Sequence, residues 1–268
     1  MSVGIIFLLS AVAFLLYIVL RSVDLGKGII AFILNKPPPL CFELFYRRLP
    51  SNYEQFLYRN EKYYRELSPK LQRNYGSRIM KFIDDKEFHG RGGLKLNHEI
   101  ILVIASAAVK ITFGLWDYKL SSFHTIIVYP DEFFSKASNL HLKGETNATG
   151  VIVFSWKDVK FGMSNPSDSI NLCYHEFAHA LFLNHLLSQL EDDFKRHYRE
   201  WLVYIKRNSK LKEVKEKHIF RDYAVTNEIE FFAVAVENFF EEPEHFKKEL
   251  PKLYEYMTKI LNQDPTKD

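Results

Sequence analysis

The chain has 268 residues, 47% hydrophobic and 15% aromatic, which is enough apolar material for one sizeable core and excludes a disordered chain. Its 36 basic and 33 acidic residues nearly balance at a net charge of +3, so direct nucleic-acid binding, which needs clustered Lys and Arg, is not expected. Two distant cysteines, Cys41 and Cys173, form no Cys-x-x-Cys pair and predict no disulfide framework.

The amino terminus contains an uncharged apolar run from Val3 to Leu20, long enough for one helix to cross a bilayer. No basic segment precedes the run and no small-x-small cleavage site follows it, which favours an anchor over a cleaved signal peptide. Basic residues follow the span, whereas Met1-Ser2 carries none, so the positive-inside rule places the rest of the chain in the cytoplasm. We therefore expect a single-pass protein of the inner (cytoplasmic) membrane.

A second apolar patch, Ile29 to Leu34, is too short to span a bilayer. Pro37-Pro38-Pro39 follow it and force an extended backbone. The patch fits either an interfacial tether or a helix edge packed on the folded domain, and the sequence leaves both interpretations open.

Apolar residues recur at three and four between Tyr53 and Phe113, which predicts helices. The glycine-rich segment His89–Gly93 is predicted to be a turn, because no strand precedes it and it lacks the spacing of a phosphate-binding loop. The β-branched and aromatic segments Thr125–Tyr129 and Gly150–Trp156 are predicted strands. They indicate a small sheet, with Gly150–Trp156 as its candidate open edge for pairing with an extended peptide.

The Pro166–Ser169 cluster supplies capping residues for a helix expected to run to about Leu187. This helix contains His175-Glu176-Phe177-Ala178-His179. Histidines at i and i+4 project from one helix face, so His175 and His179 can bind the same Zn²⁺. Glu176 lies about 100° around the helix from His175, where its carboxylate can act as the general base that deprotonates a water.

Two other sequence features bear on this motif. His98-Glu99 also reads His-Glu, but Leu102 stands where a second histidine ligand would be needed. Cys173 is turned about 200° away from His175 on the helix and is expected to be a buried packing residue rather than a ligand. Only one position in the chain therefore fits the zinc motif.

A catalytic zinc site needs a third protein ligand. His185 has the spacing of the third histidine in the metzincin pattern, but Phe182 stands where that pattern needs a glycine to end the helix. In a continued helix His185 would lie about 9 Å along the axis and off the ligand face. The geometry therefore disfavours His185 as a ligand.

The other candidates come from a later segment, Asn227 to Phe240, which opens with capping residues and is otherwise apolar, as in a buried helix. Glu230 and Glu237 are seven apart on one face, so one can bind the metal while the other braces a histidine ring or pairs elsewhere. Glu228 is expected in the exposed first turn, where it stabilises the helix dipole.

With these residues placed, the chain resembles the MtfA family of zinc peptidases, named for a protein that titrates the transcriptional repressor Mlc. The resemblance covers Leu49 to the end. The matching segments are Leu67–Leu71, Phe88-His89-Gly90 with Gly92-Gly93-Leu94, Val128-Tyr129-Pro130, Ser155-Trp156, His175–His179, and Tyr223-Ala224 followed by Glu230–Val234 and Glu237.

The resemblance implies a gluzincin-type site in which His175, His179 and Glu230 bind one zinc ion, Glu176 is the base and Tyr223 steadies the oxyanion. It also implies aminopeptidase-type activity on small substrates and binding of a repressor protein. The chain departs from the family by its predicted membrane span, since the protein that gives the family its name is soluble.

We therefore predict an α+β, mainly helical zincin-like metallopeptidase domain with a small β-sheet, preceded by one transmembrane helix. The predicted parts are an anchor over 1–22, a juxtamembrane linker over 23–48 and a peptidase domain over 49–268, helical over 49–120 and zincin-like over 121–268. The predicted function is hydrolysis of peptide or protein substrates by a zinc-activated water. The alternative is a tethered protein that sequesters a transcriptional regulator, with zinc in a structural role, although a structural site would not need Glu176.

Overall fold

The computed structural model describes residues 46–164, 169–187, 193–207, 220 and 227–267. The chain separates into two units, Met1–Phe42 and Glu43–Asp268, and all described residues belong to the second. Within these ranges, no helix is long and apolar enough to cross a membrane. The predicted span Val3–Leu20 lies outside the described residues, so the anchor and the domain bounds stay predictions.

Helices open the described part, as the apolar spacing predicts. The first of them are α2 (Ser51–Asn60), α3 (Lys62–Glu66), α4 (Pro69–Asp85) and α5 (His98–Thr112). Pro69 starts α4, where its missing N–H costs no hydrogen bond, and Asn97 caps α5 by accepting a bond from Ile100 N at 2.9 Å. The apolar faces of α4 and α5 pack together, and the buried Tyr75 hydroxyl donates to Ser106 O at 2.9 Å.

A four-stranded mixed sheet lies beside these helices, in the order β1-β2-β6-β5. Its strands are β1 (Glu87–Gly90), β2 (Thr125–Tyr129), β5 (Gly144–Asn147) and β6 (Val151–Ser155). β1 and β6 run parallel to β2, whereas β5 runs antiparallel to β6. Both predicted strands are therefore present, as β2 and β6.

The predicted turn at His89–Gly93 is only partly right. His89 and Gly90 belong to β1, and the turn begins after them, where Gly92 and Gly93 have φ of 60° and 81°. β1 is too short and polar to be recognised from periodicity, and it exists as a strand because its backbone pairs with β2.

The predicted sheet edge is wrong. Gly150–Trp156 contains β6, which is hydrogen-bonded to β2 on one side and to β5 on the other. Among the described strands the edge next to it is β5, whose sequence Gly-Glu-Thr-Asn has neither alternating hydrophobicity nor a β-branched run. Gly150, at φ 87°, closes the tight turn that brings β5 alongside β6.

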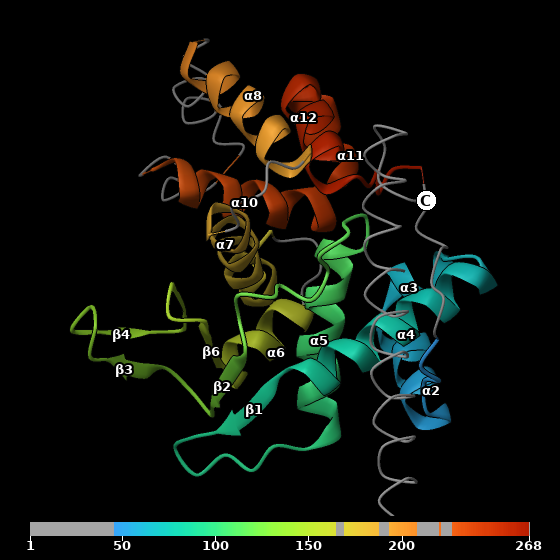
Figure 1. Ribbon diagram of the computed structural model, residues 1–268, viewed down its shortest axis with the longest axis vertical. Coiled ribbons are helices and arrows are strands. Elements are labelled where there is room, and N and C mark those ends of the chain that lie inside the picture. The colour runs from blue at the N-terminus through green and yellow to red at the C-terminus, as the bar shows by residue number, and fades with distance from the viewer. Residues whose placement is uncertain (1–45, 165–168, 188–192, 208–219, 221–226, 268) are drawn as a thin grey trace, which may run out of the picture. The chain divides into compact units, whose positions relative to one another are not determined.

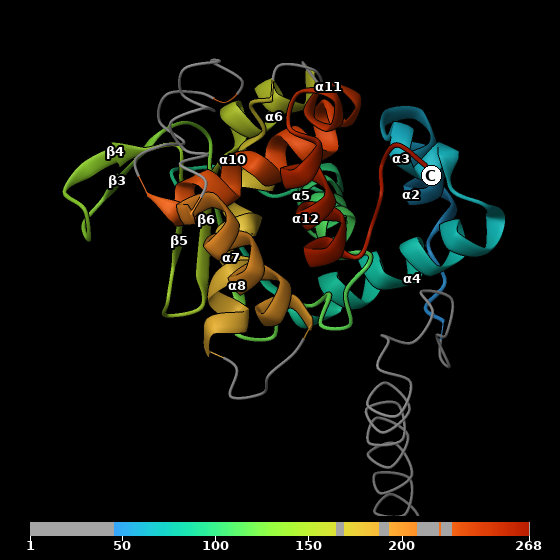
Figure 2. The same cartoon turned by 90° about the horizontal axis from the view of Figure 1, so that it is seen from above.

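A separate two-stranded sheet precedes β5. It consists of β3 (Phe133–Ser135) and β4 (Leu140–Leu142), which pair antiparallel. Both views show this hairpin projecting beyond the four-stranded sheet (Figures 1 and 2). Lys143 alone separates β4 from β5, so the hairpin continues directly into the edge strand.

The remaining helices are α6 (Trp156–Ser164), α7 (Leu172–Leu187), α8 (Asp193–Arg207), α10 (Glu228–Glu241), α11 (Pro243–Glu249) and α12 (Pro251–Leu261). In Figure 1, α7 runs between the strands and the layer formed by α8 and α10 to α12. It packs against α5, α10, β5 and β6. The described part is therefore mainly helical with a small sheet, as predicted, and the helix that packs against both the sheet and the other helices carries the histidine motif.

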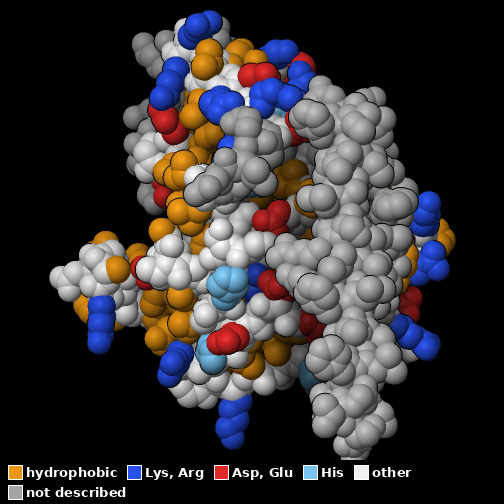
Figure 3. Space-filling view, viewed as in Figure 1, with side chains coloured by type: hydrophobic (Ala, Val, Ile, Leu, Met, Phe, Trp, Pro, Cys, Tyr) orange, Lys and Arg blue, Asp and Glu red, His pale blue; other side chains and the backbone are white. Residues whose placement is uncertain are grey.

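Charged side chains cover the outer helices. Lys and Arg gather over α8 and α12 at the top of Figure 3, with Asp and Glu between them. Several of these charges are paired, including Arg196 with Asp193 at 2.6 Å, Lys206 with Glu228 at 2.7 Å and Lys259 with Glu255 at 2.7 Å. This arrangement is typical of a solvated, ion-paired surface.

Candidate metal centre

The helix that carries the motif, α7, has no glycine or proline between its ends and runs to Leu187, as predicted. Its amino-terminal cap is Asn171, whose Oδ1 accepts a hydrogen bond from Tyr174 N at 3.1 Å. Of the predicted capping cluster, residues 166–168 lie outside the described residues. Ser169 does not cap: its φ is 55°, and its hydroxyl donates to Asn238 Oδ1 at 3.0 Å.

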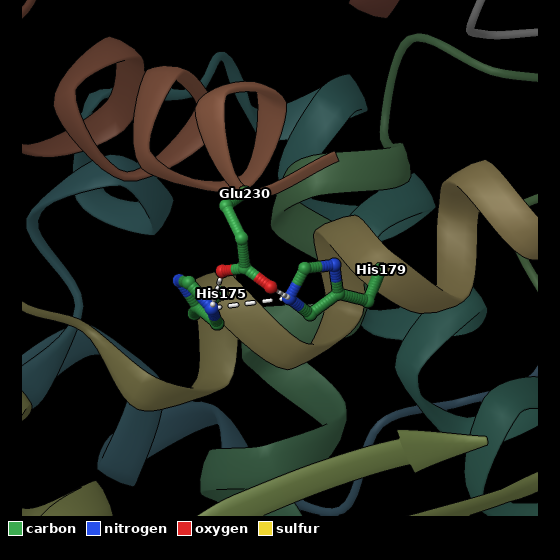
Figure 4. Close-up of side chains that lie close together, drawn as sticks. All are labelled: His175, His179 and Glu230. Atoms are coloured by element: carbon green, nitrogen blue, oxygen red, sulfur yellow. Dashed lines mark hydrogen bonds and ion pairs between the residues drawn. The ribbon is translucent and has the colours of Figure 1, made fainter. Parts of the chain in front are cut away.

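The second element of the site is the first turn of α10. Asn227 caps this helix, and its Oδ1 accepts hydrogen bonds from Ile229 N and Glu230 N, both at 2.9 Å. The helix is buried over most of its length, because apolar residues surround its axis. The cap thus holds the backbone of Glu230 while the side chain extends towards α7 (Figure 4).

Three side chains from these two helices converge on one point (Figure 4). Glu230 Oε2 lies 3.2 Å from His175 Nε2, and Glu230 Oε1 lies 3.5 Å from His179 Nε2. The two imidazole Nε2 atoms are 3.1 Å apart. One donor atom from each residue lies within 4.8 Å of the others, so the set can surround a single ion.

The chemistry of the donors fits a divalent metal. Two ligand atoms that each lie about 2 Å from a tetrahedral ion are roughly 3.3 Å apart, close to the separation of the two Nε2 atoms. Glu230 Oε2 is buried and faces His175 Nε2 at 3.2 Å, the nitrogen that would itself bind the ion. A cation between the rings and this carboxylate would satisfy that oxygen and accept both imidazole lone pairs.

Glu237 holds the orientation of His175. It is only 1% exposed, its Oε1 lies 2.8 Å from His175 Nδ1, and its Oε2 accepts from Asn171 N at 2.8 Å. Since an acceptor at Nδ1 keeps the proton there, the lone pair of Nε2 is directed at the metal position. The sequence left open which glutamate binds the metal and which braces a histidine ring. In the structure Glu230 lies beside the ion position, and Glu237 contacts the Nδ1 side of the His175 ring.

The titration of the site follows from these contacts. Burial lowers the pKa of His175, but the carboxylates of Glu230 and Glu237 outweigh burial and raise it to about 10. Burial raises the pKa of Glu230, yet hydrogen bonds from His175 and His179 outweigh burial and hold that pKa below its ordinary value. A metal ion that binds here therefore meets an ionised carboxylate and displaces a proton from an imidazole.

The side chain of Glu176 extends from α7 towards strand β5 of the sheet. It is buried, and its Oε2 accepts a hydrogen bond from Thr146 Oγ1 of β5 at 2.8 Å. Burial is the largest influence and raises the pKa of Glu176, while the neighbouring His179 and His175 act in the opposite direction. A carboxyl group with a raised pKa next to a metal position is suited to accept a proton and release it again.

Other residues considered as site members lie elsewhere. His185 is buried with its ring stacked on Phe194 at 4.0 Å, and it is not part of the converging group. Cys173 is buried on the opposite side of α7, where burial raises its pKa, as expected of a packing residue. Tyr223 lies outside the described residues, so its role stays a prediction.

The sequence did not point to Thr146, Gly144 or Asn171. The first two lie on a strand that periodicity does not reveal, and Asn171 follows the cluster that was predicted to cap the helix. The local signal for Asn171 was its residue type, because an asparagine just before a helix can cap the N–H three positions later, here that of Tyr174.

A His-Glu-x-x-His helix, a glutamate from a later helix and a small mixed sheet together define the class of α+β metallopeptidase domains. The chain belongs to one family of that class, described as glucose-regulated metallo-peptidase M90, whose sequence profile matches residues 43–261.

Individual relatives agree with this assignment. The chain is 26% identical over 259 residues to an uncharacterised protein of Synechocystis sp., covering 89% of this chain and 94% of the relative. It is 25% identical to Mlc titration factor A of Klebsiella pneumoniae, covering 74% and 82% of the two chains. It is 29% identical to Mlc titration factor A of Pectobacterium atrosepticum, covering 63% and 69%. The predicted membership of the MtfA family is therefore confirmed.

Proposed function

We propose that this protein is a membrane-anchored zinc peptidase whose active site faces the cytoplasm and hydrolyses peptide bonds with a water molecule. The observation that carries the proposal is the convergence of His175, His179 and Glu230, with the buried carboxylate of Glu176 next to two of them along α7. Such a set leaves a coordination position for solvent and supplies a base, which a purely structural metal site does not need.

Each side chain has a defined task in this proposal. His175, His179 and Glu230 hold the ion, and Glu237 keeps the ring of His175 in the binding tautomer. When bound, zinc supplies Lewis acidity, which acidifies water and polarises the substrate carbonyl. Glu176 takes a proton from the attacking water and passes it to the leaving amine, so that the carboxylate is regenerated.

The central test is Glu176→Gln in the full-length protein. Glutamine keeps the shape of the side chain but cannot take the proton, so kcat for a peptide panel should fall at least about a hundredfold with zinc content unchanged. Glu99→Gln is the matched control, because His98-Glu99 lacks a second histidine and Glu99 is exposed. Equal hydrolysis by Glu176→Gln and the wild type would remove Glu176 from its role.

The anchor and the membrane location rest on the sequence pattern of Val3–Leu20 and the basic residues after it. Alkaline extraction of membranes from cells that express the full chain, or a chain that lacks residues 1–22, tests this part. The full chain should remain in the membrane pellet and the shortened chain should be released. Release of both chains would refute the anchor.

A second function is favoured by the names of the relatives, which at 25% and 29% identity are Mlc titration factors. We propose that a transcriptional regulator similar to Mlc is a protein partner of this chain. The assay is co-sedimentation of purified Mlc with the wild type and with the Glu176→Gln variant, in which cleavage is blocked. Binding of Mlc by both the wild type and the variant would support a regulator as the partner. If neither binds Mlc, peptide hydrolysis alone would remain as the proposed function.

The type of peptidase is the finer part of the proposal. We propose aminopeptidase-type cleavage, on the family resemblance, and a series of peptides with free and acetylated amino termini tests it. Preference for the free amine is expected, and equal cleavage of acetylated peptides would indicate an endopeptidase instead.

A further inference from the structure

One contact at the metal centre is made neither by a ligand nor by the helix that carries the motif. Thr146, on the edge strand β5, places its hydroxyl 2.8 Å from Glu176 Oε2 and 3.0 Å from the main-chain oxygen of the same residue. Thirty positions of sequence separate the two residues. The contact therefore depends on how β5 packs against α7.

A hydroxyl has one hydrogen to donate, and the two acceptors are unequal. A hydrogen bond to an ionised carboxylate is roughly twice as strong as one to a neutral carbonyl, so the hydrogen of Thr146 goes to Oε2 while Glu176 is charged. When the carboxyl group carries a proton at Oε2, the same hydroxyl can accept from it and turn its own hydrogen to the main-chain oxygen. Thr146 thus has a partner in either protonation state of Glu176.

The other carboxylate oxygen is confined by the same strand. A Cβ atom built on Gly144 would lie 2.4 Å from Glu176 Oε1 and 2.7 Å from its Cδ. Real Cβ atoms do not approach so closely, so the backbone of β5 can lie against this carboxylate only because residue 144 has no side chain. One strand therefore limits both oxygens, by a hydrogen bond on Oε2 and by close backbone packing on Oε1.

We infer that β5 is the positioning element for the general base, with Thr146 as a positioning residue that acts through Glu176 and Gly144 as the position that must stay open. This inference rests on the proposed function of the site. It assigns a role to the edge strand, because the strand then sets the orientation of the group that handles the proton.

The test compares Thr146→Val, which keeps the shape but removes the hydroxyl, with Thr146→Ser, which keeps the hydroxyl. Partners that orient active-site groups typically contribute about 10- to 100-fold to activity, so Thr146→Val should lower kcat by that factor with KM and zinc content unchanged. Thr146→Ser should stay within about threefold of the wild type, because its donor remains. Thr125→Val, the same change two strands away on β2, should have no effect.

A second readout does not depend on turnover. Acetohydroxamate is a zinc ligand that would bind as its anion and give its hydroxyl proton to the neighbouring carboxylate. Its Kd for the zinc-loaded full-length protein should therefore rise about tenfold in Thr146→Val and in Gly144→Ala, and stay unchanged in Thr146→Ser. Unchanged kcat and Kd in Thr146→Val, or equal losses in the valine and serine variants, would overturn the inference.

The two proposals fail in different ways. If the wild type and Glu176→Gln hydrolyse peptides equally, or neither does, the proposed function fails and the hydroxamate Kd alone decides whether β5 orients Glu176. If Glu176→Gln is inactive and Thr146→Val matches the wild type in both readouts, only the role of β5 is lost.

Discussion

Replacing Glu237 by glutamine tests the division of roles between the two glutamates of α10. The carboxylate accepts two hydrogen bonds, from His175 Nδ1 and from Asn171 N, each at 2.8 Å, and it is only 1% exposed. Glutamine has one acceptor oxygen, so its amide nitrogen must face one of these two donors. The variant loses a hydrogen bond and a buried charge that stabilises the binding tautomer of His175.

The magnitude follows from that loss. A hydrogen bond to a charged group contributes roughly 1.5–3 kcal/mol, and about 1.4 kcal/mol corresponds to a tenfold change in an equilibrium constant. Zinc should therefore bind roughly 10- to 150-fold more weakly to Glu237→Gln. This range agrees with the usual effect of removing a partner of a metal-bound histidine.

The assay is competition for zinc between the full-length protein and a chromophoric chelator at fixed pH. Glu228→Gln is the matched control, since it lies on the same helix in a half-exposed ion pair with Lys206, and its zinc Kd should not change. A Kd for Glu237→Gln within twofold of the wild type, in a folded protein, would refute the assignment of Glu237 as the partner of His175.

Three further results are expected. Glu230→Ala should lose most of its zinc by metal analysis, and full loading would transfer the third-ligand role to Glu237 or His185. For the metal-free protein, the pKa of His175 of about 10 exceeds the unfolded value of about 6.5, so its stabilising contribution is fully present below pH 6.5 and is lost as pH rises through about 10. The free energy of unfolding, measured with urea at pH 6, 8 and 10, should fall with rising pH in the wild type and change less in His175→Gln. An equal fall in the two proteins would contradict the raised pKa of His175. Phe177→Ala removes a fully buried ring packed against Phe154, which should cost about 3–5 kcal/mol of unfolding free energy, whereas a loss below about 1 kcal/mol would contradict its core position.

Local patterns were sufficient where one element determines the geometry. The i, i+4 spacing of His175 and His179 places two rings on one face of any helix, so the candidate zinc motif was evident before the fold was known. The apolar patterns of β2, α4, α5 and α10 were equally clear, because side-chain periodicity reports which face of an element is buried. Those signals belong to single segments of about five to twenty residues.

The remaining features depend on how separate segments approach each other. Glu230 and Glu237 share one helix face, and only the packing of α10 across α7 sets which of them meets the ring nitrogens and which lies behind His175. The sheet edge was predicted at β6 and found at β5, because a short polar strand is recognised by its backbone partner rather than by its side chains.

The sequence by itself indicated the class of protein, the motif helix and a metal site, since these follow from residue type and spacing along one axis. The family resemblance already implied Glu230 as the third ligand, but only the tertiary structure shows its carboxylate beside the two rings. Tertiary structure alone brought Thr146 and Gly144 of β5 into contact with Glu176. The physical reason is that a hydrogen bond or a close backbone approach depends on distances of a few tenths of an ångström between elements, and helical or strand periodicity carries no information on the distance between elements.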